Sequence, residues 1–149
     1  KNYFVTSFDA FSLKKGLEII NTIEESGGSI VAYELCSSIR NNRELVDENN
    51  PDVYDALAKK YLNIGCACMM NNDKRIQLID ELIEEFKIDG VIDIALQSCH
   101  PFNVESNRIK EFVVNDKKIH YMAIETDYSQ SDTEQLRTRF EAFIEMIES

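Results

Sequence analysis

The stretch Gly90–Leu96 reads GVIDIAL, a short apolar run that turn residues bound on both sides. The run is too continuous to face water on one side, which is typical of a strand that helices cover on both faces of a parallel sheet. Residues 97–101 (QSCHP) then place Cys99 and His100 directly after it. The stretch therefore predicts a buried strand with reactive side chains at its carboxyl end.

Similar runs recur along the chain and alternate with helical patterns. Strands are expected at 3–6, 29–35, 64–69, 90–96 and 119–124. Apolar residues recur at helical spacing over 13–23, 53–61, 76–86, 109–113 and 136–147. Gly27 and Gly28 should end the first helix, and Ser131 with Glu134 should form a capping box for the last. The alternation predicts an α/β fold, a flavodoxin-like doubly wound parallel sheet of about five strands with helices on both faces.

Length and charge narrow the class of protein. The 149 residues suit a single α/β domain, and 27 acidic against 16 basic residues give a formal charge of -11. This charge disfavours binding to nucleic acid or to anionic membranes. No apolar run reaches the roughly 18 to 20 residues that span a bilayer, and the first residues lack the features of a signal peptide. We therefore expect a cytoplasmic location, and the absence of an initiating Met suggests an excised domain.

The four cysteines are expected at one edge of the sheet. Cys36 ends the second predicted strand, Cys66 and Cys68 lie on or just past the third, and Cys99 follows the fourth. Ligands of such sheets bind at the carboxyl ends of the strands. Cys66 and Cys68 could equally be apolar core fillers. Cys99 leaves its strand into a loop and suits a ligand or a reactive thiol better, whereas a nucleophile pair with His100 is disfavoured because adjacent side chains point apart.

The spacing of the cysteines favours an iron–sulfur cluster over zinc. Structural zinc sites usually use close C-x2-C pairs, whereas C-x-C is the only close pair here. Widely separated thiolates that converge on one cleft suit a cluster better. His120 starts the last strand at the opposite edge and is expected to be structural. The carboxylates of Glu34, Glu125 and Asp127 could add negative charge near a cluster, or could equally be helix caps, cross-domain salt bridges or exposed polar groups.

Several blocks, in order, resemble the carboxyl-terminal domain of the 2-hydroxyacyl-CoA dehydratase and benzoyl-CoA reductase family from about Gly27 onward. They are 34–36 (ELC), 63–69 (NIGCACM) with Asn72 and Arg75, 89–92 (DGVI), 97–100 (QSCH), 124–129 (IETDYS), Asp132, 135–136 (QL), 138–139 (TR) and 141–143 (EAF). The resemblance implies an oxygen-sensitive iron–sulfur protein of anaerobic metabolism. It also implies a homo- or heterodimer with a related subunit and a separate ATP-dependent activator protein that carries its own cluster.

Two branches of this family differ in the cofactor. In the dehydratase branch, the resemblance implies a [4Fe-4S] cluster for which Cys99 is one of three ligands. A second branch, whose pattern is closer, carries a double-cubane [8Fe-9S] cluster, and the resemblance then implies Cys36, Cys66 and Cys99 as cofactor-binding ligands with Cys68 spare. The chain would be part of a lyase or an oxidoreductase, and the isolated domain would be inactive.

A non-catalytic role is the alternative. A flavodoxin-like domain could bind a nucleotide or dock another subunit. No G-x-G-x-x-G follows the first predicted strand, and residues 6–9 (TSFD) offer few backbone donors for a phosphate. The sequence therefore favours the iron–sulfur interpretation over the nucleotide-binding one.

Overall fold

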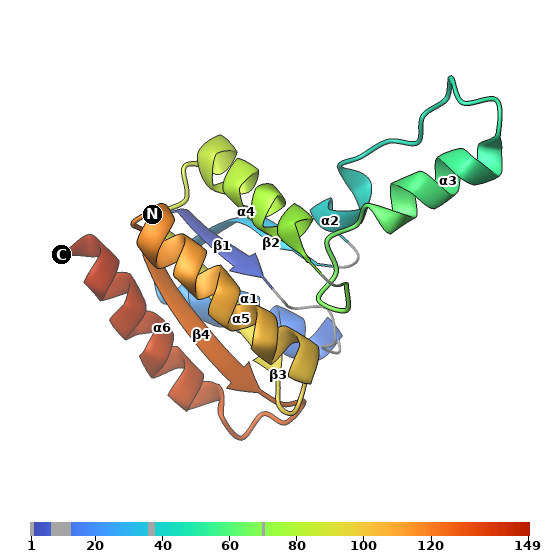
Figure 1. The fold of residues 1–149 in the computed structure, drawn as a ribbon. Helices are drawn as coiled ribbons and strands as arrows, with labels where there is room; N and C mark the ends of the chain where they lie inside the picture. The colour runs from blue at the N-terminus through green and yellow to red at the C-terminus, as the bar shows by residue number, and fades with distance from the viewer. Residues whose placement is uncertain (1, 7–12, 36–37, 70) are drawn as a thin grey trace.

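An all-parallel sheet with the order β2-β1-β3-β4 forms the centre of the molecule (Figure 1). The computed structural model describes residues 2–6, 13–35, 38–69 and 71–149. The strands are β1 (Asn2–Thr6), β2 (Ser29–Glu34), β3 (Gly90–Leu96) and β4 (His120–Thr126). The helices are α1 (Leu13–Glu25), α2 (Ile39–Asn42), α3 (Val53–Leu62), α4 (Asp73–Phe86), α5 (His100–Glu111), the π-helical turn η1 (Phe112–Asp116) and α6 (Thr133–Glu148). The flavodoxin-like α/β prediction is confirmed, with four strands in the described part of the chain rather than five.

Strand β3 is buried on both faces, as its continuous apolar sequence predicts. Ile92 and Ile94 pack into one hydrophobic core, and Val91 packs into the other. The strand pairs in parallel with β1 on one side and with β4 on the other. This central position explains why its side chains, including the polar Asp93, are almost fully covered.

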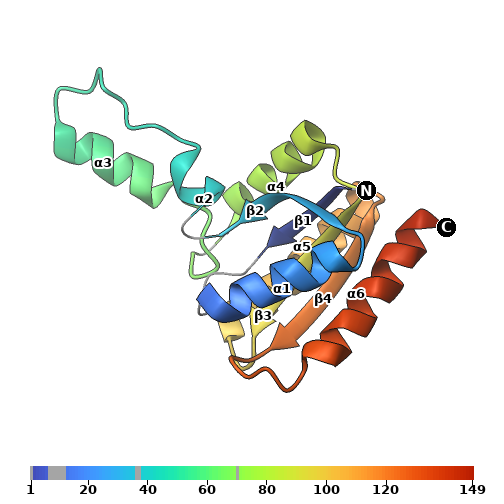
Figure 2. The same cartoon turned by 180° about the vertical axis from the view of Figure 1, so that it is seen from behind.

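Helices cover both faces of the sheet. Helices α1 and α6 lie on one face and α4 and α5 on the other, as the opposite views in Figures 1 and 2 show. The core under α1 and α6 includes Ile19, Phe140 and Phe143, and the core under α4 and α5 includes Ile79 and Ile109. Each helix thus buries one apolar stripe, which is the arrangement of a doubly wound domain.

The predicted strand at 64–69 is wrong. These residues form a tight loop between α3 and α4, in which the Cys66 amide donates to the Ile64 carbonyl at 2.9 Å and the Met69 amide donates to the Cys66 carbonyl at 2.9 Å. Cys68 and Met69 are exposed, whereas a buried strand would cover them. A short apolar run does not by itself distinguish a strand from a loop that packs one side against the core.

The capping predictions have different outcomes. Helix α1 ends as expected, because Gly27 adopts a φ of 98° and the Gly28 amide donates to the Ile23 carbonyl at 3.0 Å. The capping box at Ser131 is wrong, since α6 is preceded by Asp132. The Asp132 carboxylate does not cap the helix because it accepts hydrogen bonds from Lys15 and Thr126 instead.

The segment that carries α3 projects away from the sheet (Figures 1 and 2). Several of its large apolar side chains are exposed, among them Leu45, Tyr54 and Leu62. In the part of the chain that the structure describes, no helix combines the length and apolar character needed to cross a bilayer.

Candidate cluster site

The carboxyl ends of the parallel strands lie at one edge of the sheet. Glu34 at the end of β2 is in register with Thr6 at the end of β1, and Leu96 at the end of β3 is in register with Thr126 at the end of β4. The segments that follow these strands therefore start at the same edge, where ligands of such sheets bind.

Cys99 is fixed at this edge by the turn between β3 and α5. The turn is tight, since Ser98 has a φ of 66° and the Cys99 amide donates to the Leu96 carbonyl at 3.0 Å. The Ser98 amide donates to the Glu125 carboxylate at 3.2 Å, and this contact ties the turn to β4. Cys99 is the residue before α5, and its side chain is half-buried. The thiol thus has a defined place at the start of a helix.

Cys66 and Cys68 approach the same position from the loop between α3 and α4. Cys66 is half-buried and Cys68 is exposed. The pKa of the Cys68 thiol is raised, first by the neighbouring Cys66 thiol, through charge repulsion and a hydrogen bond, and further by Cys99. The effect of both neighbours on Cys68 supports a position of the three thiols in the same part of the sheet edge.

The structure places Cys99 directly before α5 and Cys66 and Cys68 in the loop before α4, rather than on the expected third strand. Within the described residues, no three His, Cys, Asp or Glu side chains are grouped tightly enough to hold a single metal ion. In an iron–sulfur cluster each thiolate binds a different iron atom, so its ligands need not converge on one point. Cys36, the remaining candidate ligand, lies outside the described residues.

Replacing Cys66 by serine is expected to lower the pKa of Cys68, because the main source of repulsion is removed. The thiolate is the form that reacts with iodoacetamide. The alkylation profile of Cys68 should therefore shift to lower pH in Cys66→Ser, measured by peptide mass spectrometry on reduced, cluster-free protein. An unchanged profile would mean that the two thiols are not neighbours.

A buried ion-pair network lies beside the thiols. Glu34, which is fully buried, binds Arg40 through one carboxylate oxygen and Arg75 through the other, at 2.9 Å from Arg75 Nη2. Both guanidinium groups also lie over the ring of Phe102, at 5.8 Å for Arg40 and 5.2 Å for Arg75. Glu34 thus forms salt bridges within this domain, with Arg40 and Arg75, rather than the expected cross-domain one.

Sequence reasoning named Arg75 only as part of the family resemblance and gave it no role. A signal was nevertheless present, because Arg75 lies four residues before Ile79 and therefore on the apolar stripe of α4. A charged residue on the buried face of an amphipathic helix requires a buried partner, which here is Glu34. The apolar register of α4 would have identified Arg75 as a buried arginine.

Gly65 allows the cysteine loop to approach α4 closely. A methyl group at Gly65 would lie 2.7 Å from the Arg75 backbone nitrogen and 2.9 Å from its Cα atom. Backbone atoms cannot yield as a flexible side chain can, so Gly65→Ala is expected to destabilise this region by about 1–3 kcal/mol. Urea denaturation with hydrogen exchange at α4 amides measures the loss, and Ala67→Ser should change the stability by no more than about 0.5 kcal/mol. Equal stability of the two variants would contradict the close contact.

The remaining predicted site residues have local structural roles or lie apart. The Asp127 carboxylate accepts a hydrogen bond from the Ser129 amide at 2.7 Å, and bonding to Ser129 lowers the pKa of Asp127. His100 is the first residue of α5 and is exposed. His120 starts β4 in register with Gly90, at the amino edge and away from the cysteines, as predicted.

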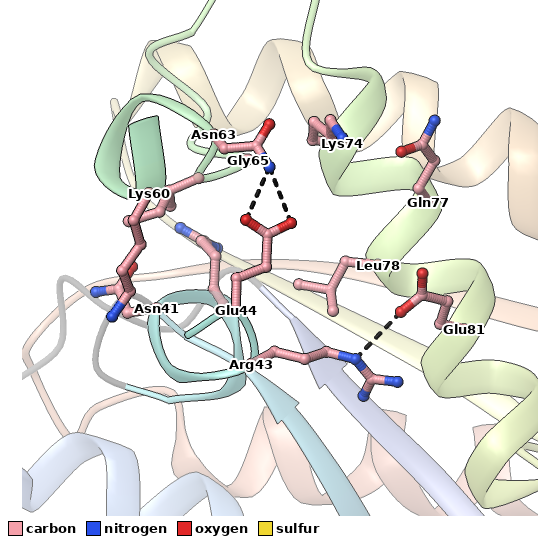
Figure 3. A pocket seen from close by; sticks show the side chains of 12 residues that line it. Asn41, Arg43, Glu44, Lys60, Asn63, Gly65, Lys74, Gln77, Leu78 and Glu81 are labelled. Carbon is pink, nitrogen blue, oxygen red and sulfur yellow. Dashed lines mark hydrogen bonds and ion pairs between the residues drawn. The ribbon is translucent and has the colours of Figure 1, made fainter. Parts of the chain in front are cut away.

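Two hollows flank the Cys66 loop. Ile64 and Gly65 line a polar pocket of about 240 Å³, in which Asn63 contacts Glu44 and Arg43 contacts Glu81 (Figure 3). The other hollow is an open groove of about 700 Å³ between residues 67–69 and the start of α5. The exposed Cys68 lines this second hollow, so its thiol is accessible from there.

Comparison with known proteins agrees with the resemblance seen in the sequence. Residues 13–147 match the family model of the 2-hydroxyglutaryl-CoA dehydratase, D-component. The chain is 49% identical over 130 residues to a protein of Escherichia coli (strain K12) named "Putative dehydratase subunit YjiM". It is 30% identical over 131 residues to the (R)-phenyllactyl-CoA dehydratase beta subunit of Clostridium sporogenes. Each match covers 87% of this chain and 34% of the relative, so the chain spans about a third of the length of these relatives.

Proposed function

Because the chain belongs to the 2-hydroxyglutaryl-CoA dehydratase D-component family, we propose that it is the iron–sulfur-binding domain of an ATP-activated dehydratase or low-potential reductase subunit. Cys99 is a ligand in either case, of a [4Fe-4S] cluster or of a double-cubane [8Fe-9S] cluster, and Cys66 and Cys36 are further ligands in the double-cubane case. The observation that carries the proposal is that Cys99, directly before α5, and Cys66 and Cys68, in the loop before α4, lie at the carboxyl edge of the sheet and influence one another electrostatically.

The donor set fits an iron–sulfur cluster. Thiolates are the ligands that iron–sulfur clusters take, and the thiols here come from two separate segments. Neighbouring thiolates repel each other, as the raised pKa of Cys68 indicates, and bound iron would offset that repulsion. Cys66 and Cys99 are half-buried, which limits solvent around a bound cluster.

The surrounding backbone supports an anionic group at this position. Cys99 immediately precedes the first turn of α5, where the positive end of the helix dipole favours negative charge. The hydrogen bond from the Ser98 amide to Glu125 holds the turn in place. When bound, the cluster supplies one-electron transfer at low potential, and the protein residues fix the thiolates and limit the access of water.

The name of one relative supports a substrate class and a partner subunit for the complete protein. One relative is a dehydratase of (R)-phenyllactyl-CoA and is a beta subunit. We propose that the complete protein acts on a 2-hydroxyacyl-CoA thioester of the same class. It would pair with a related subunit and receive electrons from an ATP-hydrolysing activator in the cytoplasm of an anaerobically growing cell.

Anaerobic purification of the complete protein tests the proposal. Brown protein with broad absorbance and acid-labile sulfide is expected, with about four iron atoms per polypeptide for a single cubane or about eight for a double one. Colourless protein that carries flavin or nucleotide in stoichiometric amount would instead indicate the binding-domain alternative.

Variants separate the two types of cluster. In the double-cubane case, replacing Cys36 and Cys66 by serine should halve the iron content. In the single-cubane case, in which Cys99 is the only ligand from this domain, the same double variant should leave the iron content unchanged. Wild-type protein loaded under identical conditions is the reference.

A further inference from the structure

Arg75 is a buried arginine at the carboxyl edge of the sheet that contacts β2, α5 and the cysteine loop. Its side chain is fully inaccessible to solvent, although it belongs to the first turn of α4, next to the cysteine loop. A guanidinium group without contact to water must be held by charged and aromatic partners. The partners of Arg75 come from segments that are far apart in the sequence.

The first partner is the end of β2. Arg75 Nη2 donates to Glu34 Oε2 at 2.9 Å, and Arg75 Nε donates to the same oxygen at 3.2 Å. Arg40 occupies the other oxygen of Glu34. The carboxylate is therefore clamped between two buried guanidinium groups, and α4 is fixed to the end of β2.

The second partner is α5. The Arg75 guanidinium lies over the ring of Phe102, three residues beyond Cys99. Arg75 Nη1 is 3.7 Å from Glu105 Oε2 on the next turn of the same helix. The same Glu105 oxygen accepts a hydrogen bond from the Asn72 side chain at 2.9 Å. The start of α4 therefore contacts α5 at Phe102 and, one turn later, at Glu105.

The third partner is the cysteine loop itself. Gly65, directly before Cys66, is buried and packs against the backbone and Cβ atom of Arg75. The position of Cys66 thus depends on where Arg75 lies, and the position of Arg75 depends on α5, which begins directly after Cys99. A displacement of the Arg75 side chain would therefore change the distance between the Cys66 and Cys99 thiols.

We propose that Arg75 is a positioning residue that sets the separation between the thiols of the Cys66 loop and that of Cys99. The consequence for cluster binding rests on the function proposed above, whereas the consequence for the thiols does not. Lysine cannot replace arginine here, because it lacks both the planar fork that binds Glu34 and the flat face that stacks on Phe102.

Thiol cross-linking of the complete, cluster-free protein tests the geometry. Dibromobimane joins two neighbouring thiols, and peptide mass spectrometry identifies each pair. Wild-type protein should give links from Cys66 or Cys68 to Cys99, together with the local link between Cys66 and Cys68. The local link is an internal reference, because both of its thiols belong to one loop.

Arg75→Lys is expected to lower the ratio of links to Cys99 over the local link by about tenfold or more, since a displacement of about 1 Å has effects of that order on reactions between positioned groups. Phe102→Leu, which removes only the stacked ring from a half-buried position, should lower the ratio in the same direction. Arg137→Lys is the matched control, because Arg137 lies on α6, on the opposite face of the sheet, and forms an ion pair with Glu25 of α1.

The outcomes separate this proposal from the proposed function. Circular dichroism identifies a variant that fails to fold, and Phe102→Leu then supplies the decisive ratio. A ratio equal to that of the wild type in folded Arg75→Lys and Phe102→Leu, or no link to Cys99 in the wild type, overturns the positioning role even if the protein binds iron. Wild-type protein without iron overturns the proposed function, while a lowered ratio in the variants still supports the positioning role.

A second measurement follows cluster loading and does not depend on turnover. Outer partners of metal ligands typically affect metal affinity by about 10- to 100-fold. Arg75→Lys should therefore need about tenfold more iron and sulfide for half-maximal reconstitution, and the electron paramagnetic resonance spectrum of its reduced cluster should differ from that of the wild type. Arg137→Lys should match the wild type in both measurements, and unaltered loading and spectrum in Arg75→Lys would count against the role.

Discussion

Replacing Cys99 by serine in the complete protein is expected to abolish the broad cluster absorbance and most of the bound iron in the single-cubane case, and at least one cubane in the double-cubane case. Cys99 occupies a tight turn at the start of α5, whereas Cys66 and Cys68 belong to a different loop. Loss of one thiolate leaves one iron atom without its protein ligand. Iron, sulfide and the visible spectrum of anaerobically purified protein measure the effect.

Cys68→Ser is the matched control for this variant. Cys68 belongs to the same group of thiols but is exposed, and the resemblance leaves it spare. This variant should retain the iron content and spectrum of the wild type. If Cys68→Ser loses iron and Cys99→Ser keeps it, the assignment of ligands is wrong.

Replacing Glu34 by alanine is expected to destabilise the region around β2 by about 3–5 kcal/mol, because two buried guanidinium groups then lose their shared counter-ion. Hydrogen exchange of the β1 and β2 amides in increasing urea, carried out on the complete protein, measures the local free energy of opening. The large effect arises from leaving buried charge unpaired.

Glu25→Ala is the control for this second variant. Glu25 pairs with Arg137 at the surface, and its loss should change the stability by no more than about 1 kcal/mol. If Glu34→Ala is no more destabilising than Glu25→Ala, the network around Arg75 is not a buried structural unit.

The sequence predicted the sheet well because its strands are continuous apolar runs between turn residues. Helices cover Gly90–Leu96 on both faces of the sheet, and a strand in that environment consists almost entirely of apolar residues. The error at 64–69 has a physical origin. The loop is apolar because Gly65 and its neighbours pack against α4. Such packing gives a short apolar run that cannot be told from a short buried strand by sequence alone.

The gathering of Cys66 and Cys99 was predicted in spite of that error. Helix α4 leads the chain back to the start of β3, so its own start lies at the carboxyl edge of the parallel sheet (Figure 1). The loop before α4 therefore reaches the edge at which Cys99 lies. The topology brings the thiols together whether or not the loop contains a strand.

The network around Arg75 could not be derived from local patterns. Its members come from β2, α2, α4 and α5, and only the tertiary fold brings Glu34 and Phe102 to the same guanidinium group. Likewise, Asp132 precedes α6 but its carboxylate binds Lys15 of α1, a contact between residues 117 positions apart. Patterns over a few residues do not contain such long-range pairings.

Alkylation of the intact and the cluster-free protein measures the central claim most directly. Anaerobic protein is treated with iodoacetamide before and after the cluster is removed by a chelator, and each cysteine is quantified by mass spectrometry. Cys99 should be protected in the brown protein and react once iron is gone, and in the double-cubane case Cys66 should behave in the same way, while the exposed Cys68 reacts in both states. Ready alkylation of Cys99 in protein that keeps its full iron content would contradict the account.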